Sequence, residues 1–247
     1  MSAPSLIASS SVHSARRDRP LFILTSLLVV AIVFAGFAQT FYLKSWFDAP
    51  PLSNLLFAHG VVMSAWLALF VAQIALVESG RVNLHRRLGV VGAALAVCLV
   101  VVGVAAALDA GRRGFSPAPQ VTPQMFLAIP LTDILVFALL VGIALVKRRN
   151  GATHKRLMLL ATVGMLTPAV ARLPIDSLKQ AGLPAFFAVT IACVIVIVLI
   201  DTVRHRRLHP ALGWGSALLI GSVPARIALA QSEAWVSIAN RLIALVR

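Results

Sequence analysis

The chain has 247 residues, of which 60% are hydrophobic and only 12% are charged. Soluble domains carry roughly 25% charged residues, so this composition excludes an ordinary soluble domain and indicates a polytopic membrane protein. The formal net charge of +14 would also fit a nucleic-acid partner, but the basic residues stand at the ends of apolar runs. That placement matches the positive-inside rule and anionic lipid headgroups, so we expect a lipid bilayer as the partner and no nucleic acid.

A helix needs roughly 20 apolar residues to cross the hydrocarbon core of a bilayer. Six runs meet that length well or nearly, and we predict spans at residues 21–43, 54–77, 88–108, 125–146, 157–173 and 185–203. A weaker seventh, at 211–229, contains Pro224 and Arg226. The first run is longer than the roughly 7–15 residues of a signal-peptide core, so we expect it to be a retained span.

The predicted fold is therefore all-α: a transmembrane helical bundle of about seven spans, or six plus a re-entrant segment, over residues 21–230. A cytoplasmic tail, residues 1–20, precedes it. Residues 231–247 are predicted as an interfacial amphipathic helix, because its apolar side chains recur on one helical stripe. The stripe consists of Trp235, Ile238, Ala239, Leu242, Leu245 and Val246.

The basic residues alternate between the two sides of the predicted bundle. The N-terminal tail and the second, fourth and sixth loops hold 14 of the 22 lysines and arginines. Positive charge favours the cytoplasmic face. We expect a bacterial inner-membrane protein with a cytoplasmic N-terminus and, given seven spans, a periplasmic C-terminus.

Two similar segments indicate an internal repeat. Residues 84–88 (Leu-His-Arg-Arg-Leu) and 153–157 (Thr-His-Lys-Arg-Leu) lie 69 positions apart, and each opens a span after a short basic loop. Spans two and three should then resemble spans four and five as parallel helical hairpins. Membrane proteins often place a binding site between such repeats.

Polar groups inside the predicted spans are the main candidates for a ligand or proton site, since they are costly in lipid and need partners. Five fall in the half of the bilayer away from the basic loops: Gln39, His59, Asp133, Arg172 and Arg226. The functional interpretation is an outward-facing polar cavity. The structural alternative is an ion pair that joins Asp133 to Arg172 or to Arg226.

The histidine-containing basic clusters allow a second interpretation. Two imidazoles on adjacent helices can form an axial pair for haem b, and cations near helix starts can hold haem propionates or anionic lipid. The candidates are His85, Arg86, Arg87, His154, Lys155 and Arg156. Against a haem, this depth is the membrane interface rather than the apolar interior.

Other polar residues give weaker signals. We expect Gln73, Glu78, Arg81 and Asp201 to pair with the basic clusters. The i, i+3 spacings of Glu78 with Arg81 and of Asp201 with Arg204 indicate solvated interfacial pairs. No HExxH or CxxC pattern predicts a metal site, and Cys98 and Cys193 fit small buried hydrophobes. No catalytic residue stands out, so we lean against an enzyme.

Several of these segments together resemble a bacterial family of multi-pass membrane proteins catalogued as a domain of unknown function. The resemblance covers about residues 54–175. It is carried by His59-Gly60, Gln73, Arg81, His85-Arg86-Arg87-Leu88-Gly89, His154-Lys155-Arg156-Leu157-Met158 and Arg172, with Lys155 where the family pattern has Arg. It implies a core of two hairpins and no particular activity. It ranks His59, His85, His154 and Arg172 above the other polar residues.

Three functional hypotheses follow from the sequence. The first is a non-enzymatic membrane protein with an outward-facing polar site for a small solute or a proton. The second is a haem-binding or quinone-linked electron carrier that uses His85 and His154. The third is a structural or assembly factor of the membrane. Whether the chain forms a homo-oligomer or binds another membrane protein stays open.

Overall fold

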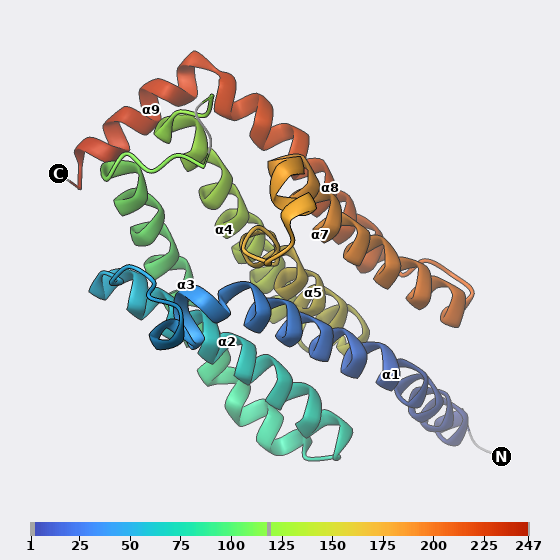
Figure 1. Ribbon diagram of the computed structural model, residues 1–247. Helices are drawn as coiled ribbons and strands as arrows, with labels where there is room; N and C mark the ends of the chain where they lie inside the picture. Colours follow the sequence, from blue (N-terminus) through green and yellow to red (C-terminus); the bar gives the residue numbers. More distant parts are fainter. Residues whose placement is uncertain (1–2, 118–119, 247) are drawn as a thin grey trace.

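The computed structural model describes residues 3–117 and 120–246, with side chains from Arg19 onward. All regular secondary structure in this part of the chain is helical, and it contains no strand. The elements are α1 (Ala3–Phe37), a π-helical turn (Ala38–Tyr42), a 3-10 turn (Lys44–Trp46), α2 (Asn54–Glu78), α3 (Val82–Arg112), α4 (Pro123–Val146), α5 (Gly151–Gly164), α6 (Thr167–Val170), α7 (Asp176–His205), α8 (Pro210–Gln231) and α9 (Glu233–Ala244) (Figure 1).

Six of the helices in the described residues are long and apolar enough to cross a membrane, which confirms the predicted all-helical membrane fold. They are the Arg19–Tyr42 stretch, α2, α3, α4, α7 and α8. Large apolar side chains point outward along them; on α3, for example, Val90, Val97 and Val101 are all more than 60% exposed. Such a surface suits lipid rather than water. The chain is therefore a polytopic membrane protein in contact with a lipid bilayer.

The fifth predicted span is not one continuous helix. It divides into α5 and the short α6, and the break falls where Pro168 follows Thr167. Proline has no N–H to donate to the carbonyl of Gly164, four residues earlier, so the helical hydrogen-bond ladder is interrupted there. Residues buried on every side of α5 place it at the centre of the bundle, next to α4, α7 and α8 (Figure 1).

The two predicted hairpins are present as α2–α3 and α4–α5, each closed by a short turn. Gly80 turns the first with a φ of +74°, a conformation that glycine adopts without steric cost. Asn150 caps α5 in the second by accepting a hydrogen bond from the Thr153 N–H at 3.1 Å. These turns and the loop at 206–209 lie at one end of the bundle, here called the basic end. The ion pair between Arg19 and Glu78 (3.1 Å) lies there too.

Helix α9 crosses the opposite end of the bundle and packs on α3 and α4 (Figure 1). Trp235, Ala239 and Ile243 form its buried face, and the Trp235 indole N–H donates to the Gln124 carbonyl at 2.8 Å. The amphipathic helix is thus present, but the predicted stripe is only partly right. Ile238 is 49% exposed and Leu245 is 80% exposed, because the buried face follows i, i+4, i+8 spacing onto the protein.

Candidate functional site

Two of the five predicted polar groups form an ion pair between α4 and α8. The Nη1 of Arg226 donates to the Asp133 carboxylate. The Arg226 side chain is 2% exposed and that of Asp133 16%. Ser222, one turn earlier on α8, accepts from Arg226 through its hydroxyl at 2.7 Å and its carbonyl at 3.1 Å. The sequence left two partners for Asp133, Arg172 and Arg226, and in the structure Asp133 pairs with Arg226.

A small hollow borders this pair, at the break between α5 and α6. It is lined by Asp133, Gly164, Thr167, Phe187, Thr190, Ile191, Val194, Leu219, Ile220, Val223 and Arg226. Its free space is enough for about one water molecule. Two of the lining hydroxyls, Thr167 Oγ1 and Thr190 Oγ1, are hydrogen-bonded to each other at 3.0 Å. Discontinuous helices in membrane transporters often end at such a site.

The other three predicted residues lie elsewhere at the same end of the bundle. Arg172 donates to the Pro168 carbonyl at 2.8 Å and its guanidinium stacks 5.0 Å from the ring centre of Phe37. His59 lies near the start of α2 and is partly buried. Gln39 is exposed on the π-helical turn that ends the first span. Of the five predicted residues, the structure thus joins Asp133 with Arg226 in an ion pair, whereas Arg172 contacts Pro168 and Phe37.

At the basic end, the repeat brings its two equivalent histidines together. The rings of His85 and His154 lie edge to face with 6.5 Å between their centres. Each ring also contacts the first helix of its own hairpin. His154 Nδ1 lies 2.8 Å from the Ala144 carbonyl oxygen of α4. The Gln73 side-chain amide of α2 is oriented so that its oxygen accepts from the Gly89 N–H at 3.1 Å, and its nitrogen then lies 2.6 Å from His85 Nδ1.

These contacts assign a hydrogen to one ring nitrogen of each histidine. A carbonyl only accepts, so His154 Nδ1 must donate and its Nε2 is free of hydrogen when the ring is neutral. The Gln73 nitrogen only donates, so His85 Nδ1 must accept and its hydrogen sits on Nε2. Nε2 is the atom with which His85 would have to bind iron across from His154. The arrangement fits a neutral histidine pair better than two haem ligands.

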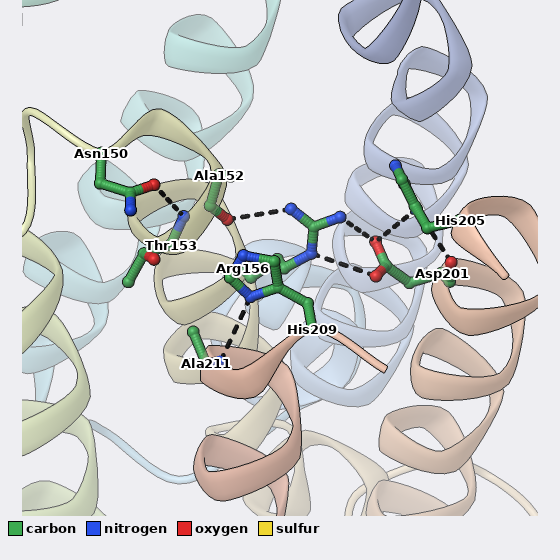
Figure 2. Close-up of polar contacts among 8 residues, drawn as sticks. All are labelled: Asn150, Ala152, Thr153, Arg156, Asp201, His205, His209 and Ala211. Atoms are coloured by element: carbon green, nitrogen blue, oxygen red, sulfur yellow. Dashed lines mark hydrogen bonds and ion pairs between the residues drawn. The ribbon is translucent and has the colours of Figure 1, made fainter. Parts of the chain in front are cut away.

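A buried charged cluster, shown in Figure 2, joins α5, α7 and the start of α8. Arg156 donates to both carboxylate oxygens of Asp201, from Nε at 3.1 Å and from Nη2 at 2.7 Å. Its Nη1 donates to the Ala152 carbonyl at 3.0 Å. Asp201 is fully buried and Arg156 is 3% exposed. The expectation that Asp201 and Glu78 pair with the basic clusters is confirmed, since they bind Arg156 and Arg19. The expected solvated i, i+3 pairs with Arg204 and Arg81 are wrong.

The spacing of apolar residues along α7 indicated that Asp201 lies on the buried face of this helix. Asp201 lies four residues after Ile197 and seven after Val194, both of which are buried, so all three share one helical face. A carboxylate on that face must find a cation. The basic clusters were the expected partners, but the particular residue could not be identified from sequence, because Arg156 stands 45 residues earlier among three consecutive basic or ionisable residues.

Two histidines border the Arg156–Asp201 pair. His205 Nδ1 lies 2.9 Å from the Asp201 carbonyl oxygen and 3.7 Å from its Oδ1. His209 caps α8, with Nδ1 accepting from the Ala211 N–H at 3.2 Å. Partial burial lowers the pKa of His209, as do the charges of Arg156 and Arg207, while Asp201 opposes them. The lowered pKa favours the neutral ring, the form whose Nδ1 can accept from the Ala211 N–H.

The remaining basic-cluster residues lie at the surface or against apolar rings. Arg86 and Arg87 are exposed at the start of α3, and Lys155 Nζ lies 5.4 Å from the ring centre of Phe22. Within the described residues, no group of three or more His, Cys, Asp or Glu side chains is arranged to hold a metal. Cys98 is exposed and Cys193 half-buried, both as free thiols.

Comparison of the chain with protein-family models, with curated proteins and with solved structures finds no match.

Proposed function

We propose that this chain is a non-enzymatic membrane protein that binds a proton at the Asp133–Arg226 pair and passes it through the neighbouring hollow. The observation that carries the proposal is the position of this ion pair beside a broken helix. An ionisable pair inside a span is costly and is a functional-site candidate by default. Here it also lines a hollow at the break between α5 and the four-residue α6.

The size of the hollow favours a proton over a larger solute. Space for about one water molecule admits a hydrogen-bonded relay through Asp133 and the Thr167 and Thr190 hydroxyls. It does not admit an organic substrate without opening of the bundle. Asp133 lies ten residues into α4 from the end opposite the basic one, about 15 Å at 1.5 Å per residue.

We further propose that the protein lies in a bacterial inner membrane with its basic end at the cytoplasm, by the positive-inside rule. The hollow would then be nearer the periplasmic face. We also propose that the chain belongs to the bacterial membrane-protein family of unknown function that its sequence resembles. Single cysteines at Arg149 and Ser45, in a chain with Cys98 and Cys193 replaced by alanine, test the orientation. A membrane-impermeant maleimide should label only position 45 in spheroplasts.

The proton site is tested in proteoliposomes that contain a pH-sensitive dye. With an imposed pH gradient, a chloride medium, and potassium and valinomycin on both sides to clamp the potential, wild-type protein should dissipate the gradient faster than empty liposomes. Asp133→Asn should return the rate to the empty-liposome level. Asp176→Asn, a carboxylate whose side chain is 89% exposed, is the matched control and should keep the wild-type rate.

Loss of flux in Asp133→Asn could also reflect misfolding, because the change leaves Arg226 buried without its counter-charge. Asp133→Glu retains the carboxylate and should retain part of the flux. Size-exclusion profiles of all variants establish that they fold. Equal rates for wild-type and empty liposomes would refute the proposal.

A haem-binding electron carrier is the second candidate, favoured by the 6.5 Å approach of His85 and His154. The hydrogen assigned to His85 Nε2 argues against haem binding, because a protonated ring nitrogen has no lone pair for iron. An absorption spectrum of protein expressed with haem precursor decides between the two. A stoichiometric Soret band that is lost in His85→Ala would replace the first proposal by this one.

A further inference from the structure

The Asp133–Arg226 pair is electrically neutral, and this neutrality limits what its site can bind. One carboxylate and one guanidinium face each other, with Arg226 also held by Ser222 and lying 5.2 Å from the ring centre of Phe187. Among the described residues that line the hollow, none besides this pair is charged. Of the residues lining the hollow, α5 and α6 contribute Gly164 and Thr167, and α7 contributes Phe187, Thr190, Ile191 and Val194.

A proton on Asp133 would break this balance. The neutral carboxylic acid would leave the Arg226 guanidinium buried without a counter-charge, and an uncompensated charge in a low-dielectric interior is strongly unfavourable. The Arg226 side chain is 2% exposed and is held at Nε and Nη2 by Ser222. A second ligand of negative charge at the same site would restore neutrality. An anion without the proton would instead place two negative charges against one positive charge.

The hollow defines the kind of anion. Its space for about one water molecule fits a monatomic ion and excludes phosphate, sulfate or a carboxylic acid. A guanidinium carries five N–H donors, so Arg226 retains donors beyond those given to Asp133 and Ser222. The hydroxyls of Thr167 and Thr190 lie at the same hollow and can rotate to donate. The apolar remainder of the wall suits a weakly hydrated ion.

We propose that the hollow beside Asp133 and Arg226 binds a halide-sized anion together with a proton, as one electroneutral unit. The inference rests on the proposed proton site and gives it a co-ligand. Because binding free energies are reciprocal, the proton strengthens anion binding by the same factor by which the anion strengthens proton binding. Where Asp133 is ionised in the free protein, the apparent chloride affinity should rise about tenfold for each unit of pH decrease.

Calorimetric titration of the detergent-purified full chain with sodium chloride tests this linkage, with sodium gluconate as the bulky-anion control. Titrations in two buffers of different ionisation enthalpy give the number of protons taken up per chloride. Wild type should take up about one proton per chloride at pH values where Asp133 is ionised. Gluconate should give no binding heat.

Three variants separate the proposal from a purely structural role of the pair. Asp133→Asn imitates the protonated carboxyl, so it should bind chloride with no proton uptake and no pH dependence. Arg226→Gln should lose chloride binding, whereas Arg226→Lys should keep it in weakened form. Asp176→Asn should behave as wild type in both affinity and proton uptake.

The outcome is distinguishable from that of the proton proposal. Proton flux in gluconate proteoliposomes equal to that in chloride, with no chloride binding by wild type or Asp133→Asn, would overturn the anion inference and leave the proton site standing. If wild-type protein shows neither proton flux above empty liposomes nor chloride binding, both the proton site and the anion site are refuted. Folded Asp133→Asn that binds no chloride, while wild type does, would also count against the electroneutral unit.

Discussion

Arg156 and Asp201 stand 45 residues apart in the chain, yet they share two charge-assisted hydrogen bonds, at 3.1 and 2.7 Å, at the basic end of the bundle (Figure 2). The pair ties the start of the central helix α5 to the end of α7. The third nitrogen of the guanidinium donates to the Ala152 carbonyl, so each Arg156 nitrogen has a partner. Such full satisfaction is the condition under which a buried ion pair is tolerated.

Removing one member of this pair should destabilise the protein strongly. Asp201→Asn leaves the Arg156 charge buried and uncompensated, and we expect a loss of about 3–5 kcal/mol in the free energy of unfolding. The measurement is SDS-induced unfolding in mixed micelles. Asp176→Asn, on an exposed carboxylate, should change it by less than about 0.5 kcal/mol. The double variant Arg156→Met with Asp201→Leu should recover most of the loss. A single variant as stable as wild type would contradict the assignment.

His209 should make stability depend on pH in the acidic range. Its pKa in the folded protein is lowered by burial and by the charges of Arg156 and Arg207. The unfolded chain then binds a proton more readily than the folded one. The contribution of His209 is fully present above its unfolded pKa of about 6.5. It is lost as pH falls through the lower, folded value.

Thermal midpoints measured in detergent from pH 8 to pH 5 test the role of His209. His209→Asn keeps a capping side chain that does not titrate, so its midpoint should fall less below pH 6.5 than that of wild type. His209→Ala removes the cap and should cost about 1 kcal/mol at neutral pH. Parallel pH curves for wild type and His209→Asn would show that another group causes the acid sensitivity.

The tautomers of His85 and His154 give a spectroscopic prediction. Nitrogen-15 chemical shifts at neutral pH should place the hydrogen of His85 on Nε2 and that of His154 on Nδ1, since Gln73 donates to the first ring and Ala144 accepts from the second. Gln73→Leu removes the donor and should let His85 populate both tautomers. His154 should keep its shift in that variant. A hydrogen on His85 Nδ1 in wild type would contradict the assigned Gln73 orientation.

Close packing of α1 on α6 predicts a selective effect of adding one methyl group. A Cβ at Gly36 would overlap the backbone carbonyl of Ala169, which cannot move aside as a flexible side chain could. Gly36→Ala should therefore cost about 1–3 kcal/mol. Gly142 of α4 is also in a span but has no neighbour within 4 Å of that position. Equal SDS-unfolding midpoints for Gly36→Ala and Gly142→Ala would refute the close approach.

Composition and helical periodicity were sufficient for the membrane class, the helical hairpins and the approximate ends of the spans. These properties depend on local chemistry, namely the transfer of apolar residues into lipid and the capping of helices by Ser53, Thr122 and Asn150. The repeat also predicted that His85 and His154 occupy equivalent places.

The pairing of charges was decided only by tertiary packing. Asp133 forms an ion pair with Arg226 rather than with Arg172, and Asp201 forms one with Arg156 rather than with Arg204. The physical reason is that an ion pair depends on which helices are neighbours and how each is rotated, whereas sequence spacing gives only the residues that share a face of one helix. The sequence shows Pro168 inside the fifth predicted span, where a proline interrupts helical hydrogen bonding. Its consequence, a hollow beside Asp133 and Arg226, required α4, α7 and α8 to close around it.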